Sequence, residues 1–225
     1  MSIKTKALIG LAAVVAMSGG FWLSQIQQSS IETDTHDARQ KALADARRNF
    51  SPIQGSILSP ARKISVPVLN RDDGTDFTIE DLKGKWHLIF FGYTHCPDVC
   101  PVTLGAVAQA KKMAAVDEQT FPEVVFISVD PERDKVEMLA EYVQYFDKDF
   151  IGVTGDEKMI QALTLQMSVV YMKMPVEEGA SGYIVDHSAA LLLLDPEGRL
   201  VAFLNPPHDP ATILKDFQTV VDQYQ

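Results

Sequence analysis

Both cysteines of the chain, Cys96 and Cys100, lie in the stretch GYTHCPDVCP. Two thiols at this spacing can form a disulfide, act as a redox couple or bind a soft metal. A disulfide across so short a loop constrains little of the unfolded chain, so a purely structural bridge is disfavoured. A structural zinc site needs four protein ligands, and two cysteines do not supply the usual sulfur set. The sequence therefore favours a thiol–disulfide couple or a metal site with a third ligand from elsewhere.

The third ligand of such a metal site would be a histidine. His95 adjoins Cys96 and can lower the pKa of that thiol. His187, in VDHSAALLLL, comes just before an apolar strand, where a histidine is most often a hydrogen-bonded core residue. A strand that starts beside the cysteine loop would instead place this imidazole over the thiolates. Two thiolates and one imidazole form a three-coordinate soft site that suits Cu(I), and Cu(II) can also bind. The histidines of the chain are His36, His87, His95, His187 and His208.

The cysteine loop lies at a predicted strand–turn–helix junction. The apolar stretch HLIFFGY (87–93) predicts a strand covered on both faces, and Pro101 indicates that the regular helix begins near that residue. Ligands of α/β folds usually bind at the carboxyl ends of the strands. The N–H groups and the dipole of a helix N-terminus favour the thiolate, which is both a nucleophile and a soft-metal ligand.

From about Pro60 onward, predicted strands alternate with predicted helices. The stretch EVVFISV (123–129) predicts a second covered strand, and residues 189–204 predict two strands joined by a DPEG turn. Together these elements predict a mixed α/β fold, in which helices flank both faces of the sheet.

Three helix starts are predicted from capping residues. Asp134 and Glu137 have the spacing of a capping box, and Asp209 precedes a proline at the first helical position. Asp156 is predicted to start a further helix that buries Met159 among other apolar residues.

The N-terminal region predicts export. Residues 7–23 carry no charge and follow two lysines, so we expect residues 1–24 to form a transmembrane anchor, with a cleaved signal peptide as the alternative. Residues 25–57 are predicted to be a polar spacer with one helix at 34–49, and residues 58–225 to be the folded domain. An exported domain faces an oxidising compartment, in which two thiols are reactive. The formal net charge of −10, without a large basic cluster, argues against nucleic acid as a partner.

Three motifs together resemble the Sco/SenC family. They are FGYTHCPDVCP (91–101), VDPERD (129–134) and YIVDH (183–187), and they occur in the family's order. The resemblance extends from about Leu58 to the C-terminus, and the combination of a CPxxCP motif with a distant DH pair is highly specific.

The resemblance implies a thioredoxin-like domain that faces the periplasm or the mitochondrial intermembrane space. The N-terminus lacks the Arg- and Ser-rich composition of a transit peptide, which favours a bacterial protein with its anchor in the inner membrane. Family members bind one copper ion through residues that correspond to Cys96, Cys100 and His187. They help to build the dinuclear CuA centre in subunit II of cytochrome c oxidase, by delivering copper, by reducing that subunit's cysteines, or both. Subunit II is therefore the expected partner, and other copper chaperones or thiol reductases are further candidates.

A copper chaperone is thus the leading interpretation, with two alternatives. One is a thiol–disulfide oxidoreductase or thiol peroxidase that uses Cys96 and Cys100 as a redox pair, and the other is a redox-responsive signalling protein. His187 discriminates between the copper chaperone and the oxidoreductase, because an oxidoreductase could tolerate His187→Ala whereas a copper site would lose copper affinity.

Several residues near the motifs have two interpretations. Asp98 can tune the thiolates or simply form a turn, and Asp186 can orient the ligands or cap a turn. Met172 and Met174 share one face of a predicted strand, where packing is favoured over copper binding. The charged residues of the loop Asp130–Asp134 are candidates for docking a partner, namely Glu132 and Arg133.

Overall fold

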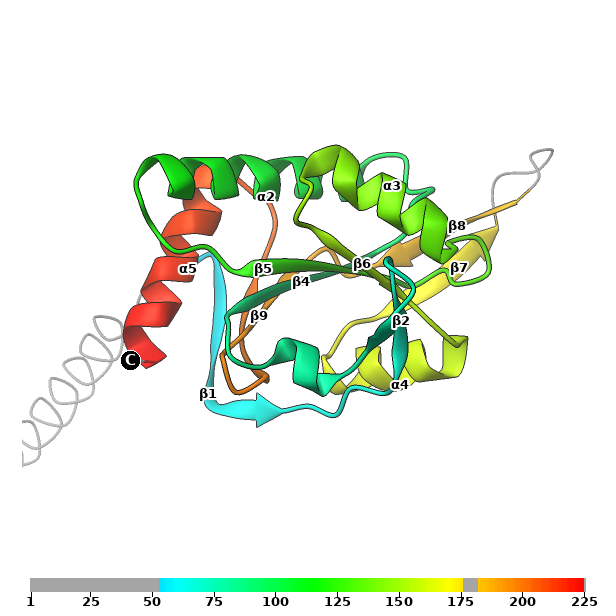
Figure 1. The fold of residues 1–225 in the computed structure, drawn as a ribbon, viewed down its shortest axis with the longest axis horizontal. Helices are drawn as coiled ribbons and strands as arrows, with labels where there is room; N and C mark the ends of the chain where they lie inside the picture. The colour runs from blue at the N-terminus through cyan, green and yellow to red at the C-terminus, as the bar shows by residue number, and fades with distance from the viewer. Residues whose placement is uncertain (1–52, 176–181, 225) are drawn as a thin grey trace, which may run out of the picture. The chain divides into compact units, whose positions relative to one another are not determined.

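The computed structural model describes residues 53–175 and 182–224, which form an eight-stranded sheet and a separate two-stranded hairpin (Figure 1). The strand order of the large sheet is β1-β10-β9-β4-β5-β6-β2-β3, and the hairpin pairs β7 with β8. The strands are β1 (Gly55–Lys63), β2 (Leu69–Arg71), β3 (Asp76–Phe77), β4 (His87–Gly92), β5 (Glu123–Ser128), β6 (Ile151–Thr154), β7 (Tyr171–Pro175), β8 (Tyr183–His187), β9 (Leu191–Leu194) and β10 (Arg199–Leu204). The helices are η1 (Ile79–Leu82), α2 (Val99–Val116), α3 (Val136–Phe146), α4 (Glu157–Gln166) and α5 (Pro210–Tyr224).

The centre of the large sheet consists of β4, β5 and β6, which are parallel, and of β9, which runs antiparallel to β4. Every residue of β4 is buried, as a strand covered on both faces requires. The register pairs Gly92 at the end of β4 with Ser128 at the end of β5. The loops that follow these two strands, which contain the cysteines and the VDPERD motif, therefore leave the sheet at the same edge.

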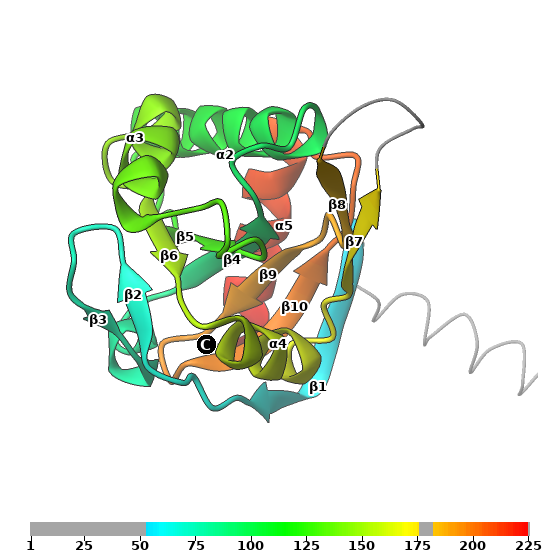
Figure 2. The ribbon, with the colours of Figure 1, turned by 90° about the vertical axis from the view of Figure 1, so that its right-hand side faces the viewer.

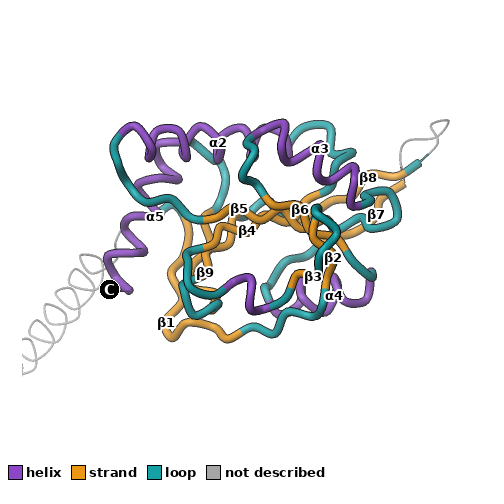
Figure 3. Tube along the Cα trace, viewed as in Figure 1, coloured by secondary structure: helices purple, strands orange, loops and turns teal. Residues whose placement is uncertain are grey.

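Helices cover both faces of this sheet. Figures 1 and 2 show α2 and α3 on one face and α4 on the other, and α5 packs against α2. The ring of Trp86 meets that of Phe217 edge to face at 6.0 Å, which fixes α5 beside the start of β4. The tube in Figure 3 shows how loops connect the strands to these helices. The predicted mixed α/β architecture is confirmed.

Two of the three predicted helix caps are present. The carboxylate of Asp156 accepts a hydrogen bond from the N–H of Lys158 at 2.9 Å, and Asp209 accepts one from the N–H of Thr212 at 2.9 Å. The predicted DPEG turn also forms, with the N–H of Gly198 donating to the carbonyl of Asp195 at 2.9 Å.

The predicted capping box at Asp134 is wrong. The helix α3 begins at Val136, and its N-cap residue, Lys135, makes no side-chain cap bond. Asp134 is buried and its carboxylate binds elsewhere, as described below. The prediction for Met159 was also wrong, since this side chain is 42% exposed while Ile160 beside it is buried.

Two predicted boundaries shift. β1 begins at Gly55, inside the segment predicted as spacer, because this part of the chain pairs with β10. The helix α2 begins at Val99 rather than near Pro101, since a proline is tolerated in the first turn, where its missing N–H would have no helical partner.

Within residues 53–175 and 182–224, no helix combines the length and the apolar character that crossing a membrane requires. The predicted anchor (1–24) and the predicted spacer helix (34–49) lie outside the described residues.

Candidate metal centre

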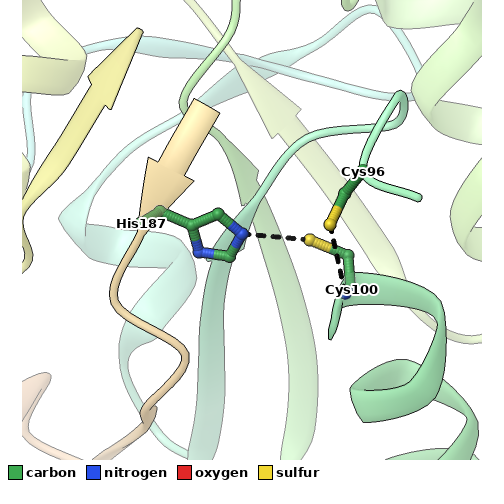
Figure 4. A group of neighbouring side chains, drawn as sticks. All are labelled: Cys96, Cys100 and His187. Atoms are coloured by element: carbon green, nitrogen blue, oxygen red, sulfur yellow. Dashed lines mark hydrogen bonds between the residues drawn. The ribbon is translucent and has the colours of Figure 1, made fainter. Parts of the chain in front are cut away.

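The structure brings Cys96, Cys100 and His187 together at the edge of the sheet where β4 ends (Figure 4). One ligand atom from each residue lies within 4.8 Å of the other two. The Sγ atom of Cys100 is 3.3 Å from Nε2 of His187. Among the described residues, this is the only cluster of three or more histidine, cysteine or acidic side chains with metal-site spacing.

The two cysteines are positioned by the turn between β4 and α2. The N–H of Cys96 donates to the carbonyl of Tyr93 at 3.2 Å, which closes the turn after the strand. Cys100 lies in the first turn of α2, and its N–H donates to Sγ of Cys96 at 3.4 Å. Cys96 is 9% exposed and Cys100 is fully buried, so the pair is approached from the Cys96 side.

The two thiols differ in protonation. The pKa of Cys96 is lowered to about 3, mainly because the Cys100 thiol donates a hydrogen bond to it, and the His187 ring and the N–H of Asp98 contribute. Burial acts in the opposite direction. The pKa of Cys100 is raised, because this thiol is the donor to Cys96 and is buried. In the reduced protein, Cys96 is therefore the thiolate and Cys100 holds the proton.

The imidazole of His187, the last residue of β8, is oriented by its surroundings. The ring of Tyr93 meets it edge to face at 5.9 Å, and the ring of Phe90 lies at 6.0 Å. Its Nδ1 atom lies 3.1 Å from the carbonyl oxygen of Ser188. This contact holds the ring with Nε2 directed at the sulfurs. With copper bound, Nδ1 would keep the proton that it donates to this carbonyl, and Nε2 would supply the lone pair to the metal.

The donor set fits copper. Two sulfurs and one imidazole nitrogen are soft or borderline ligands, and three of them suit Cu(I). The side chains converge from a turn, a helix and a hairpin, so folding rather than local sequence assembles the set.

Asp134 is the residue near the site whose role was missed. Its carboxylate accepts from the N–H of Thr94 at 3.0 Å, from the hydroxyl of Thr94 at 2.6 Å and from the hydroxyl of Ser128 at 2.6 Å. Asp134 thereby fixes the start of the cysteine loop. Its place in the VDPERD motif was the only available signal, and the capping-box spacing with Glu137 offered a competing explanation.

The other described histidines do not join the cluster. His95 is exposed, and its Nδ1 lies 3.0 Å from the hydroxyl of Thr94. His87 lies at the opposite end of β4, 3.3 Å from the carboxylate of Glu123. His208 hydrogen-bonds through Nε2 to the carbonyl of Ala189 at 2.7 Å. His36 lies outside the described residues.

The secondary candidates lie around the cluster rather than in it. Asp98 is exposed and acts on Cys96 through its backbone N–H, not through its carboxylate. Asp186 is exposed on β8, and on the adjacent β7 Met172 and Met174 are 60% and 42% exposed. The last two side chains alternate with Tyr171, whose cross-strand partner is His187, so they occupy the opposite face of the hairpin.

The fold and the site define a class, namely a thioredoxin-like domain with a Cys-Cys-His cluster in the turn after a central strand. The SCO1/SenC family model matches residues 67–222. The chain therefore belongs to the SCO1/SenC family.

Individual relatives agree with this assignment. Protein SCO1 homolog 1, mitochondrial, from Arabidopsis thaliana is 41% identical over 192 residues, which cover 83% of this chain but only 56% of that protein. The crystal structure of Arabidopsis thaliana ScoI with copper bound is 40% identical, has a TM-score of 0.66 and covers 72% of this chain and 100% of that one. The structure of Bradyrhizobium japonicum ScoI with copper bound is 36% identical and has a TM-score of 0.58. The match covers 70% of this chain and 99% of that one. Copper, the cofactor expected from the sequence, is thus bound in solved relatives.

Proposed function

We propose that this protein is a copper chaperone that binds one copper ion through Cys96, Cys100 and His187. It delivers the ion to the CuA centre of cytochrome c oxidase subunit II. The convergence of the two sulfurs and Nε2 within 4.8 Å carries the proposal. The copper bound in the Arabidopsis and Bradyrhizobium relatives supports it.

The geometry suits a donor of copper. Three ligands hold Cu(I) firmly and leave a coordination position open to an incoming thiolate. Copper can then pass to a partner through an intermediate in which donor and acceptor share the ion. Cys96 already holds a thiolate at neutral pH, so one of the two sulfurs binds without losing a proton first.

The low pKa of Cys96 also favours a second candidate, a thiol–disulfide oxidoreductase. The Cys96 thiolate would attack a disulfide of the oxidase subunit, forming a mixed disulfide and releasing one partner thiolate. Cys100, after losing its proton, would attack Cys96 and release the second partner sulfur. The pair would thus become a disulfide, and its two electrons would reduce the partner.

We further propose that residues 1–24 anchor the chain in the bacterial inner membrane with the folded domain in the periplasm. The uncharged run 7–23 after two lysines supports this topology. A chain that lacks residues 1–24 is expected to leave the membrane fraction and to keep its copper affinity. Retention of that shortened chain in the membrane would rule out this anchor.

Competition between the reduced protein and a Cu(I) chelator tests the ligand set. We expect His187→Ala to lower Cu(I) affinity by about 10- to 100-fold or more, since changes in the surroundings of a ligand alone cost that much. His95→Ala is the matched control, because His95 adjoins Cys96 without joining the cluster, and it should leave the affinity unchanged. Equal affinity of wild type and His187→Ala would refute the proposed site.

A second experiment separates the chaperone from the oxidoreductase. The copper-loaded protein is mixed with the reduced, copper-free subunit II domain, and the metal-free dithiol is mixed with the oxidised domain. A chaperone transfers copper in the first mixture without net thiol oxidation. An oxidoreductase acts only in the second mixture and tolerates His187→Ala.

A further inference from the structure

The hairpin that carries His187 does not belong to the main sheet. β7 and β8 pair with each other in a two-stranded sheet of their own (Figure 2). Alternate residues of β8 turn toward the domain, namely Tyr183, Val185 and His187, and none of these three is fully exposed. The position of the imidazole therefore depends on side-chain contacts that hold β8 against the rest of the fold.

A cluster of polar side chains makes such contacts at the start of β8. The hydroxyl of Tyr183 donates to Oδ1 of Asp130 at 2.7 Å. Arg133 donates through Nε to the other carboxylate oxygen of Asp130 and through Nη1 to the carbonyl of Tyr183 at 3.1 Å. The Arg133 guanidinium also stacks over the Tyr183 ring at 3.9 Å. These three residues, called the latch below, join β8 to the loop after β5.

The latch is also connected to His187 through the side chain of Tyr93. The Arg133 guanidinium lies 5.6 Å from the centre of the Tyr93 ring, and that ring meets the His187 imidazole at 5.9 Å. Tyr93 in turn follows β4 and precedes the cysteine loop. Arg133 thus lies between the ring that starts β8 and the ring that packs against the metal ligand.

The carboxylate of Asp130 depends on these contacts because it is buried. The carboxylate of Asp130 is 0% exposed, and such a buried charge is stable only when it is paired. Arg133 and Tyr183 supply the pairing from two sides. Burial and the neighbouring Asp130 raise the pKa of Tyr183, so its hydroxyl remains a donor. Lys173 on β7 also forms ion pairs with Glu132 and Glu157, at 3.2 and 3.3 Å. These ion pairs are more exposed and therefore weaker.

We propose that Asp130, Arg133 and Tyr183 are positioning residues that hold β8 where His187 can ligate copper, and thereby set how fast the protein releases the ion. The inference rests on the proposed copper site. When the latch opens, the imidazole leaves the ion, and Cu(I) remains on two sulfurs with its third position free. A partner thiolate can then enter at that position.

The rate at which bound Cu(I) passes to excess bathocuproine disulfonate, a Cu(I) chelator, tests the latch. Tyr183→Phe removes the hydroxyl but keeps the ring that Arg133 covers, and should accelerate transfer about tenfold, because a hydrogen bond to a buried charge is lost. Arg133→Lys keeps the charge but loses the planar fork and should act in the same direction. Tyr145→Phe is the matched control, since Tyr145 is 84% exposed, and should leave the rate unchanged.

The decisive comparison places Tyr183→Phe in a His187→Ala background. A latch that acts through His187 predicts no further acceleration there. The inference is overturned if Tyr183→Phe transfers copper at the control rate, or if its full acceleration persists without the imidazole. If His187→Ala alone leaves the rate unchanged, the ligand set itself is refuted and the inference falls with it. A failure of the latch alone looks different: His187→Ala still releases copper faster than the wild type, whereas Tyr183→Phe does not.

Discussion

The buried carboxylate of Asp134 accepts hydrogen bonds from both the N–H and the hydroxyl of Thr94, at 3.0 and 2.6 Å. The two residues are 40 positions apart in the sequence. Their contact joins the loop after β5 to the loop after β4, two residues before Cys96. The cysteine loop is therefore fixed by the neighbouring strand connection as well as by its own turn.

Thr94→Val tests this connection, because valine has nearly the same shape and lacks the hydroxyl. We expect a loss of about 1.5–3 kcal/mol in the free energy of unfolding, since the bond involves a buried charge. Chemical denaturation of the reduced protein measures it. Thr219→Val is the control, because the Thr219 hydroxyl only binds the Lys215 carbonyl of its own helix at an exposed position. Equal stability of the two variants would show that the hydrogen bond from the Thr94 hydroxyl to Asp134 does not stabilise the fold.

Gly92, the last residue of β4, should be essential to the metal centre although it supplies no ligand. A Cβ atom at this position would lie 2.7 Å from Sγ of Cys100 and 2.7 Å from a ring carbon of Phe126. Neither atom can move away easily, since the side chains of Cys100 and Phe126 are both fully buried. Gly92→Ala is therefore expected to displace the Cys100 sulfur and to lower Cu(I) affinity by about tenfold or more.

Gly105→Ala is the matched substitution for this experiment. Gly105 lies in the middle of α2, and a Cβ atom there would meet no atom within 4 Å. The change should raise the free energy of unfolding by about 0.5–1 kcal/mol and leave copper affinity unchanged. Copper titration and thermal unfolding of both variants measure the pair of effects, and an unaltered copper affinity in Gly92→Ala would be contrary to the structure.

Much of the architecture follows from local pattern. The apolar stretches at 87–93 and 123–129 and the DPEG turn have short-range signals, and they form the predicted strands and hairpin. Asp134 shows where such signals mislead, because its spacing to Glu137 fits a capping box while its actual partners come from β5 and the cysteine loop. Long-range hydrogen bonds of this kind leave no periodic trace in a single sequence.

The metal cluster was predictable only as a set of residue types. The spacing of Cys96 and Cys100 identified the sulfurs, and the choice of His187 among five histidines depended on family resemblance. The orientation of its ring by Tyr93 and the carbonyl of Ser188 had no local signal. The latch was likewise hidden, since Arg133 and Tyr183 are far apart in the chain and their contact depends on how β8 packs.

The pKa difference between the cysteines gives a pH-dependent prediction. In the reduced, metal-free protein, the thiolate absorption of Cys96 in the ultraviolet should persist from neutral pH down to about pH 5, because its pKa is about 3 rather than the ordinary 9.0. The sign follows from the lowered pKa: the thiolate is present above that pKa and is lost only as the pH falls through it.

Cys100→Ala removes the main donor to the Cys96 thiolate. The pKa of Cys96 should therefore rise toward its ordinary value, and the thiolate absorption at neutral pH should decrease. His187→Ala should produce a smaller rise, because the imidazole is the weaker of the two donors. A titration curve that Cys100→Ala leaves in place would mean that another group stabilises the thiolate.

X-ray absorption spectroscopy of the Cu(I)-loaded protein tests the central claim most directly, because it identifies the atoms bound to the metal. For the wild type we predict two sulfur ligands and one imidazole nitrogen, and for His187→Ala two sulfurs without the imidazole signal. A wild-type spectrum without an imidazole contribution, or an imidazole signal that survives in His187→Ala, would contradict the Cys96–Cys100–His187 site.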